Sequence, residues 1–254
     1  ESVSASGKQF ITGVAAGYEV MERLASDYIP TVMSRGFHAS PVFGIFGAAI
    51  AAAKIMDLTE EQINNVIGMC VHLSSGNLEG PRSGGRALRE GAAARNAMVA
   101  ISLAVMGQIG GETTLDGEAG FYHAYTGNNL GRLTYSFVGD TRSSLDNITK
   151  GLGQDWTFLE TLYRTYSTAG YNLAHVDVTA QICKENDITF EDVDRVEAVV
   201  NWLETQYPSP AFPSRREDGE ASQGGTKYYS AYGVVNRGFP MLRSQQMGVA
   251  DGDG

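Results

Sequence analysis

The stretch RGFHASPVFGIFGAAIAAAK, residues Arg35–Lys54, decides the fold, because it predicts one uncharged helix with two unlike faces. Ser40 suits the N-cap and Pro41 the first helical position, so the helix is predicted to start just after His38. The small face holds Gly44, Gly47, Ala48, Ala51 and Ala52, and the bulky face holds Phe43, Phe46 and Ile50. Such a helix fits the middle of a helical stack, where backbones approach closely on the glycine side.

A membrane span is the competing interpretation of this run, which is long enough to cross a bilayer. The run contains His38, Ser40 and Pro41, however, and it is built mostly of alanine instead of leucine. We therefore expect a buried helix of a globular protein.

The composition narrows the class of protein. The chain has 254 residues, of which 43% are hydrophobic, so it can bury a sizeable core. Its net charge of −10 disfavours nucleic acid and anionic membrane surfaces as partners. The two cysteines, Cys70 and Cys183, lie in apolar helical contexts, which favours a reducing compartment over a disulfide framework. We expect a cytoplasmic protein, or one of the mitochondrial matrix in a eukaryote, and both ends of the sequence suggest a piece of a longer chain.

Helical patterns continue on both sides of the opening stretch. Thr59 and Gln62 form a capping box, and Gly107 is placed to end a helix in a left-handed conformation. Neither signal depends on distant parts of the chain. The further helices are predicted at 8–27, from 59 toward 76, at 87–106 and, shorter, at 113–126.

The sequence pattern changes beyond about residue 130, where turn-forming residues replace the long stretches of helical periodicity. We therefore predict a mainly α protein with a large all-helical domain at 1–150 and a smaller α+β domain at 151–254. The smaller domain is expected to contain a helix at about 171–186, a strand in VDRVEAVVNW (193–202) and a last helix around 231–239.

Basic side chains gather at and just before the start of the helix predicted at 87–106. They are Arg82, Arg86, Arg89 and Arg95. Cations at a helix N-terminus oppose its dipole, at about 0.3–1 kcal/mol each, so a compensating anion is expected there. Guanidinium groups and free backbone donors together suit a carboxylate ligand. The alternative is a solvated basic loop that is paired with Glu79 and Glu90.

Histidine is the side chain best suited to carry a proton near neutral pH. His38 lies directly ahead of a buried helix, where its ring can face a cavity, whereas His72 has a structural context. The sequence does not decide the role of His123, and His175 begins a helix of the second domain. No metal-ligand spacing, phosphate loop or nucleophile elbow is found, so neither a metal nor a nucleotide cofactor is supported.

Four segments resemble the MmgE/PrpD family, which includes 2-methylcitrate dehydratase, cis-aconitate decarboxylase and iminodisuccinate epimerase. They are SGKQFITGVAAGYEVMERLA (6–25), RGFHASPVFGIFGAAIAAAKIMDLTEEQ (35–62), REGAAARNAMVAISLAVMG (89–107) and FEDVDRVEAVV (190–200). The resemblance implies an all-helical domain with an α+β lid, an active site between them, homodimers, and proton chemistry on di- or tricarboxylates without a cofactor.

The resemblance also assigns residues. His38 stands at the family's active-site histidine, and His175 and Tyr232 correspond to a histidine and a tyrosine of the lid. Arg86 and Arg89 replace a lysine and a histidine of the family. Arg164 replaces a lysine of the lid. These replacements keep charge but lose acid/base capacity, since a guanidinium does not exchange its proton near neutral pH.

The resulting hypothesis is a lyase, a dehydratase of a substrate such as 2-methylcitrate, in which His38 removes a proton next to a carboxylate. Arg86, Arg89 and Arg164 would bind the substrate, while Tyr232 or His175 would serve the leaving hydroxyl. The alternatives are a decarboxylase, an epimerase, or a catalytically silent scaffold or binding protein.

Overall fold

The computed structural model describes residues 3–78, 84–127, 145–163, 173–189, 192 and 194, and for residues 84–87, 175 and 176 the backbone alone. The described residues fall into two compact units, one up to Thr161 and the other from Leu162 onward. The domain boundary near residue 150 stays a prediction. The strand expected at 193–202, apart from residue 194, and the helix expected around 231–239 lie outside the described residues.

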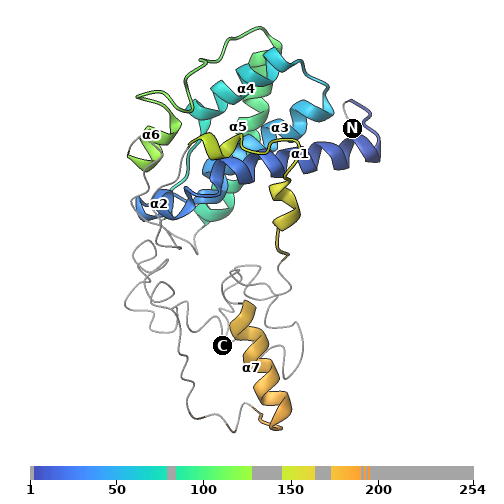
Figure 1. Ribbon diagram of the computed structural model, residues 1–254, viewed down its shortest axis with the longest axis vertical. Helices are drawn as coiled ribbons and strands as arrows, with labels where there is room; N and C mark the ends of the chain where they lie inside the picture. Colours follow the sequence, from blue (N-terminus) through green and yellow to red (C-terminus); the bar gives the residue numbers. More distant parts are fainter. Residues whose placement is uncertain are drawn as a thin grey trace. The chain divides into compact units, whose positions relative to one another are not determined.

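Every regular element in the described part of the chain is helical, which confirms the mainly α class (Figure 1). The first unit holds α1 (Gly7–Ala25), α2 (Ile29–Ser34), α3 (Ala39–Ile55), α4 (Glu60–Leu73), α5 (Gly84–Val105), α6 (Phe121–Thr126) and the short 3₁₀ helices η1 (Leu145–Ile148) and η2 (Thr157–Glu160). The second unit holds α7 (Leu173–Glu185), close to the helix predicted at 171–186.

Helix α3 packs against α1, α4 and α5, and both of its faces are used as predicted. On the small face, a Cβ atom added to Gly17 of α1 would lie 2.5 Å from the carbonyl oxygen of Gly47. On the bulky face, Phe43 and Phe46 are buried, and their rings meet Phe121 of α6 edge-on at 5.5 and 5.2 Å. The glycines therefore let two backbones touch, while the aromatic side chains fill the core beyond them.

Helix α3 starts just after His38 as predicted, but its N-cap residue and first helical residue differ from the prediction. The helix begins at Ala39, the N-cap position is His38, and Pro41 is the third helical residue. Ser40 does not cap the helix, because its hydroxyl donates a hydrogen bond to Glu90 of α5 instead. Proline is tolerated throughout the first turn, where backbone N–H groups have no helical acceptor, so the shift in register costs nothing at Pro41.

The other helix-end signals are confirmed. Thr59 Oγ1 accepts from the backbone of Gln62 at 3.2 Å, and the Gln62 side chain accepts from the Thr59 backbone at 3.0 Å. Gly107 has a φ of +84°. It ends α5: its N–H donates to the Ala104 carbonyl and the N–H of Gln108 donates to the Leu103 carbonyl, the pattern of a Schellman motif. The helix predicted at 113–126 is shorter than expected, since only α6 forms and turns precede it.

A buried ion pair joins α1 to the segment that carries η1 and η2. Arg23 pairs with Glu19 one turn earlier and donates to the backbone carbonyls of Ile148, Lys150 and Asp155. Burial raises the pKa of Glu19, but hydrogen bonds from the Phe158 backbone and from Arg23 outweigh it and lower the pKa overall. The segment from residue 145 to 161 is thus held on α1 by satisfied buried charges.

Candidate functional site

Two loops hold His38 in place. The loop that leads into α3 pairs with the loop after α4 through an antiparallel bridge between Phe37 and Asn77. The backbone N–H of His38 donates to the Gly76 carbonyl at 3.1 Å. Gly76 has a φ of +129°, and a Cβ atom there would lie 2.6 Å from Cγ of Pro41. Only glycine fits this position, so the backbone of His38 is fixed by tight local packing.

The side chains of four residues meet at this point. Ser40 Oγ donates to Glu90 Oε2 at 2.6 Å and lies 3.1 Å from Nδ1 of His38. The other carboxylate oxygen of Glu90, Oε1, lies 3.5 Å from His38 Nδ1 and 3.6 Å from Arg89 Nε. The carboxylate of Glu90 is therefore the centre of a cluster that consists of His38, Ser40, Arg89 and Glu90, hereafter the His38 cluster.

The His38 cluster lies at the surface, with one well-buried member. The side chain of His38 is 21% exposed and that of Glu90 is 41% exposed, whereas that of Arg89 is 10% exposed. Arg89 Nη1 donates to the Asn77 carbonyl at 2.7 Å, so its guanidinium is fixed to the same loop that holds His38. The site thus offers a titratable imidazole at a boundary with water and a cation anchored beneath it.

Further hydrogen bonds tie the loop after α4 to its neighbours. Ser74 Oγ donates to the Val42 carbonyl of α3 at 2.9 Å, and Tyr125 of α6 donates to the Ser74 carbonyl at 2.8 Å. Asn96 of α5 donates to the Leu73 carbonyl at 2.9 Å. Three helices therefore brace the loop, which keeps the His38 cluster preorganised.

The structure does not describe the side chains of the remaining predicted site residues. Arg86 lies in the first turn of α5, one helical turn before Arg89, but only its backbone is described. His175 lies on α7 in the second unit, again with its backbone alone. Arg164 and Tyr232 lie outside the described residues. The roles of these four residues stay predictions.

Sequence reasoning missed two members of the cluster. Ser40 was interpreted as a helix cap, and Glu90 only as the partner of a solvated basic loop. The available signal was weak: a hydroxyl two residues after a histidine, and an acid among arginines. Neither pattern reveals that the two side chains meet, because 50 residues separate them.

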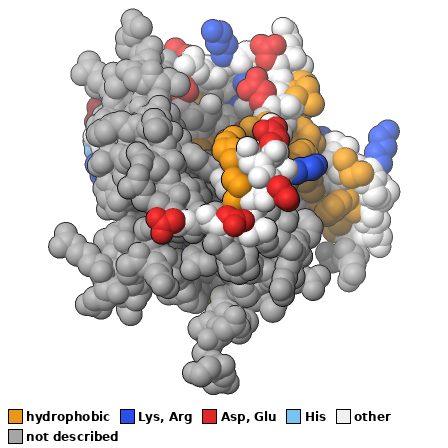
Figure 2. Space-filling model, turned by 90° about the horizontal axis from the view of Figure 1, so that it is seen from below, with side chains coloured by type: hydrophobic (Ala, Val, Ile, Leu, Met, Phe, Trp, Pro, Cys, Tyr) orange, Lys and Arg blue, Asp and Glu red, His pale blue; other side chains and the backbone are white. Residues whose placement is uncertain are grey.

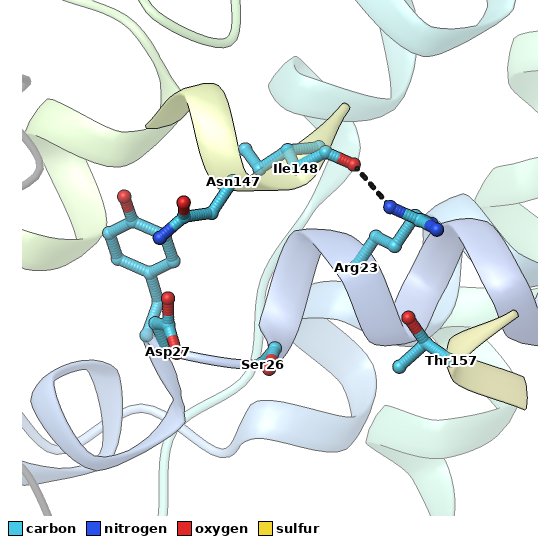
Figure 3. A pocket seen from close by; sticks show the side chains of 7 residues that line it. Arg23, Ser26, Asp27, Asn147, Ile148 and Thr157 are labelled. Carbon is cyan, nitrogen blue, oxygen red and sulfur yellow. Dashed lines mark hydrogen bonds between the residues drawn. The ribbon is translucent and has the colours of Figure 1, made fainter. Parts of the chain in front are cut away.

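A small pocket of about 70 Å³ lies elsewhere in the first unit, beside Arg23 (Figure 3). It is lined by Arg23, Ser26, Asp27, Tyr28, Asn147, Ile148 and Thr157, none of which belongs to the His38 cluster. Arg23 points toward the carbonyl of Ile148 and is bound by it at 3.2 Å, as Figure 3 shows. Its guanidinium donates hydrogen bonds to backbone carbonyls, so we assign this pocket to the scaffold.

On the face shown in Figure 2, the blue side chains of lysine and arginine stand apart from one another among acidic ones. None of the helices described is long and apolar enough to cross a membrane. Within the same residues, no three His, Cys, Asp or Glu side chains are grouped so that they could hold a metal ion.

Comparison with known proteins shows the family to which the chain belongs. Residues 1–132, just over half of the chain, match the MmgE/PrpD N-terminal domain. The chain belongs to the MmgE/PrpD family. The match covers α1 to α6 and includes every member of the His38 cluster.

Two curated proteins are similar to this member of the MmgE/PrpD family. The "cis-aconitate decarboxylase-like protein oryM" of Aspergillus oryzae is 28% identical over 59% of this chain and 30% of its own length. The "cis-aconitate decarboxylase" of Homo sapiens is 30% identical over 46% of this chain and 24% of its own length. The matched part therefore spans less than a third of the length of each of these relatives.

Proposed function

We propose that the protein is a lyase that acts on a di- or tricarboxylate, with His38 transferring a proton at the carbon next to a carboxylate. The observation that carries this proposal is the meeting of the His38 imidazole and the Arg89 guanidinium around one carboxylate, that of Glu90. A site that already accommodates a carboxylate between a cation and a proton carrier suits a carboxylate substrate. Membership of the MmgE/PrpD family and the names of both relatives agree with it.

In a dehydration, the imidazole takes a proton from the carbon next to the carboxylate. The electron pair of that C–H bond forms the double bond, and the hydroxyl on the neighbouring carbon leaves with a proton as water. Carbon acids of this kind are weak, so Arg89, with Arg86 and Arg164, stabilises the negative charge that builds up on the carboxylate. His175 or Tyr232 supplies the proton to the departing hydroxyl.

Decarboxylation is the second candidate, and the names of both relatives favour it. Here the bond to one carboxylate breaks, CO₂ leaves, and the electron pair that remains on carbon accepts a proton. The protonated imidazole of His38 would deliver that proton, and the arginines would hold the carboxylates that stay. The same cluster thus serves either reaction. We further propose that the protein acts as a homodimer in the cytoplasm.

The two reactions are separated by incubating the full-length protein in D₂O with 2-methylcitrate, citrate, cis-aconitate and iminodisuccinate. Nuclear magnetic resonance then follows the substrate, and a CO₂ assay runs alongside. Loss of water with formation of an alkene supports the dehydratase, and release of CO₂ with deuterium on carbon supports the decarboxylase. Deuterium exchange alone would indicate an epimerase. An unchanged set of compounds would favour a silent scaffold or binding protein and would refute the lyase.

The role of His38 is tested by His38→Gln. We expect the rate with the active substrate to fall by about 100-fold or more, because general acid–base catalysis typically contributes that much. The matched control is His72→Gln, since His72 is exposed on α4 and outside the cluster. Circular dichroism should show both variants folded. A His38→Gln variant as active as His72→Gln would remove His38 from the mechanism.

A further inference from the structure

The hydrogen bonds of Ser40 constrain the protonation of His38. A serine hydroxyl has one hydrogen to donate, and at 2.6 Å from Glu90 Oε2 that hydrogen goes to the carboxylate, which can only accept. Ser40 Oγ also lies 3.1 Å from His38 Nδ1. Because the hydroxyl hydrogen is already used, Ser40 can only accept in this second contact. Nδ1 must therefore carry a proton, and in the neutral imidazole the lone pair is on Nε2.

We propose that Glu90 is a positioning residue that acts through Ser40 to hold His38 in the tautomer with its basic nitrogen at Nε2. The chain of contacts runs from Nδ1–H of His38 to the hydroxyl of Ser40 and on to the carboxylate of Glu90. It gives the imidazole a fixed ring orientation and one defined basic atom. This inference rests on the proposed function for its catalytic consequence, but the tautomer it requires exists in the resting protein.

Glu90 also forms an ion pair with Arg89, but this is the looser contact of its carboxylate. Arg89 Nε is 3.6 Å from Glu90 Oε1, which is too long for a hydrogen bond. The short contact of Arg89 is to the Asn77 carbonyl, at 2.7 Å, and the short contact of Glu90 is to Ser40. The carboxylate is thus bound most closely to the hydroxyl that faces the imidazole. Its charge also stabilises the imidazolium that forms when His38 takes up a proton.

Two variants of Glu90 separate the effect of the hydrogen-bond chain through Ser40, hereafter the relay, from the effect of the negative charge of Glu90. In Glu90→Gln the amide oxygen still accepts from Ser40, so the relay is kept and only the charge is lost. In Glu90→Met no acceptor remains, and the Ser40 hydroxyl becomes free to turn and donate to Nδ1. We therefore expect Glu90→Met, but not Glu90→Gln, to move the proton of neutral His38 from Nδ1 to Nε2.

The first measurement is the tautomer itself, from the ¹⁵N chemical shifts of the His38 ring in the full-length protein without substrate. The unmodified protein and Glu90→Gln should show the proton on Nδ1, and Glu90→Met should show it on Nε2. Assignment is secured with His38→Gln, whose spectrum lacks the signal. A proton on Nε2 in the unmodified protein, or the same tautomer in all variants, would overturn the proposal, whatever the enzymatic activity proves to be.

The second measurement is turnover of the compound that the D₂O experiment identifies. We expect kcat of Glu90→Met to fall on the order of 10- to 100-fold while KM changes little, by analogy with other outer partners of functional histidines. Glu90→Gln should lose only a few-fold, with a shifted pH profile. The control, Glu61→Met, changes an exposed acid at the start of α4. A lower KM with unchanged kcat in Glu90→Met would instead mean that Glu90 merely occupies the substrate's place, and it would overturn the positioning role.

Discussion

Two pairs of glutamate and arginine lie on helices in the part of the chain that the structure describes, and they are used in opposite ways. Glu19 and Arg23 on α1 are both 6% exposed in their side chains, and Arg23 donates to three backbone carbonyls. Arg89 and Glu90 on α5 are 10% and 41% exposed, and the carboxylate of Glu90 faces Ser40 and His38. The same two residue types thus build a closed scaffold in one place and an accessible polar cluster in the other.

The difference lies in what completes the hydrogen bonds. In the α1 pair the backbone of the segment 145–161 binds both charges, so most of the hydrogen-bond donors of Arg23 are used within the chain. In the α5 pair the carboxylate meets side chains that can change their protonation or rotate, and part of it is in water. A buried charge that the chain itself satisfies points to structure, whereas a half-exposed one next to a titratable group points to function.

Removing each arginine in turn is the most direct test of whether the two pairs differ in their contribution to stability. Arg23→Met leaves the carboxylate of Glu19 and the bound carbonyls without their donor in a dry environment, so we expect a loss of about 3–5 kcal/mol in the free energy of unfolding. Arg89→Met removes the bond to the Asn77 carbonyl beside an exposed carboxylate, and we expect a loss of about 1 kcal/mol. Urea unfolding followed by circular dichroism measures both.

The control for both arginines is Arg95→Met, because Arg95 is exposed on α5 and its guanidinium hydrogen-bonds only to the side chain of its neighbour Asn96 among the contacts described. Its effect should stay within about 0.5 kcal/mol. Equal losses for Arg23→Met and Arg89→Met would show that the distinction between scaffold and site is wrong.

The close packing of α1 on α3 belongs to the scaffold, and it is tested at the glycines between the two helices. Gly17→Ala would place a Cβ atom 2.5 Å from the backbone oxygen of Gly47, which cannot move aside. Overpacking outweighs the better helix propensity of alanine, so we expect a net loss of about 1–2 kcal/mol. Gly44→Ala on α3 is the matched control: a Cβ atom there meets nothing within 4 Å. It should stabilise by up to about 1 kcal/mol. The idea fails if both variants are equally stable in urea.

The smallest expected effect is the pH dependence that the α1 pair confers. The pKa of Glu19 is lower in the folded protein than its ordinary value of 4.5, so the ionised carboxylate stabilises the fold above that value. This stabilisation is lost as the pH falls through the lowered pKa. The difference in unfolding free energy between the unmodified protein and Glu19→Gln should be constant near neutral pH and shrink in acid. A difference that does not change down to pH 3 would contradict a lowered pKa.

Local signals predicted much of the helical framework. The capping box at Thr59 and the terminating Gly107 are correct because each involves hydrogen bonds between residues within five positions of one another. The two-faced pattern of α3 correctly predicted a helix that touches another backbone on its glycine side. The N-cap of α3 was predicted two residues late, at Ser40 instead of His38, because serine fits the cap preference well.

The candidate site was predictable only in part. His38 and Arg89 were singled out from their residue types and from the family resemblance, and the structure puts them around one carboxylate. Ser40 and Glu90 could not be paired from sequence, since their bond spans 50 positions. The role of Arg23 was equally hidden, because the backbone carbonyls that it binds lie 125 to 132 residues away.

The sequence by itself determined the helical class, the start of α4, the end of α5, the two faces of α3 and, through its motifs, the MmgE/PrpD family. These features depend on residues one or two helical turns apart. Only the tertiary structure decided which glutamate supports the scaffold and which faces the histidine. That choice depends on which distant backbone group or side chain completes each hydrogen bond. The contribution of a polar group to stability is set by its burial and its partner together.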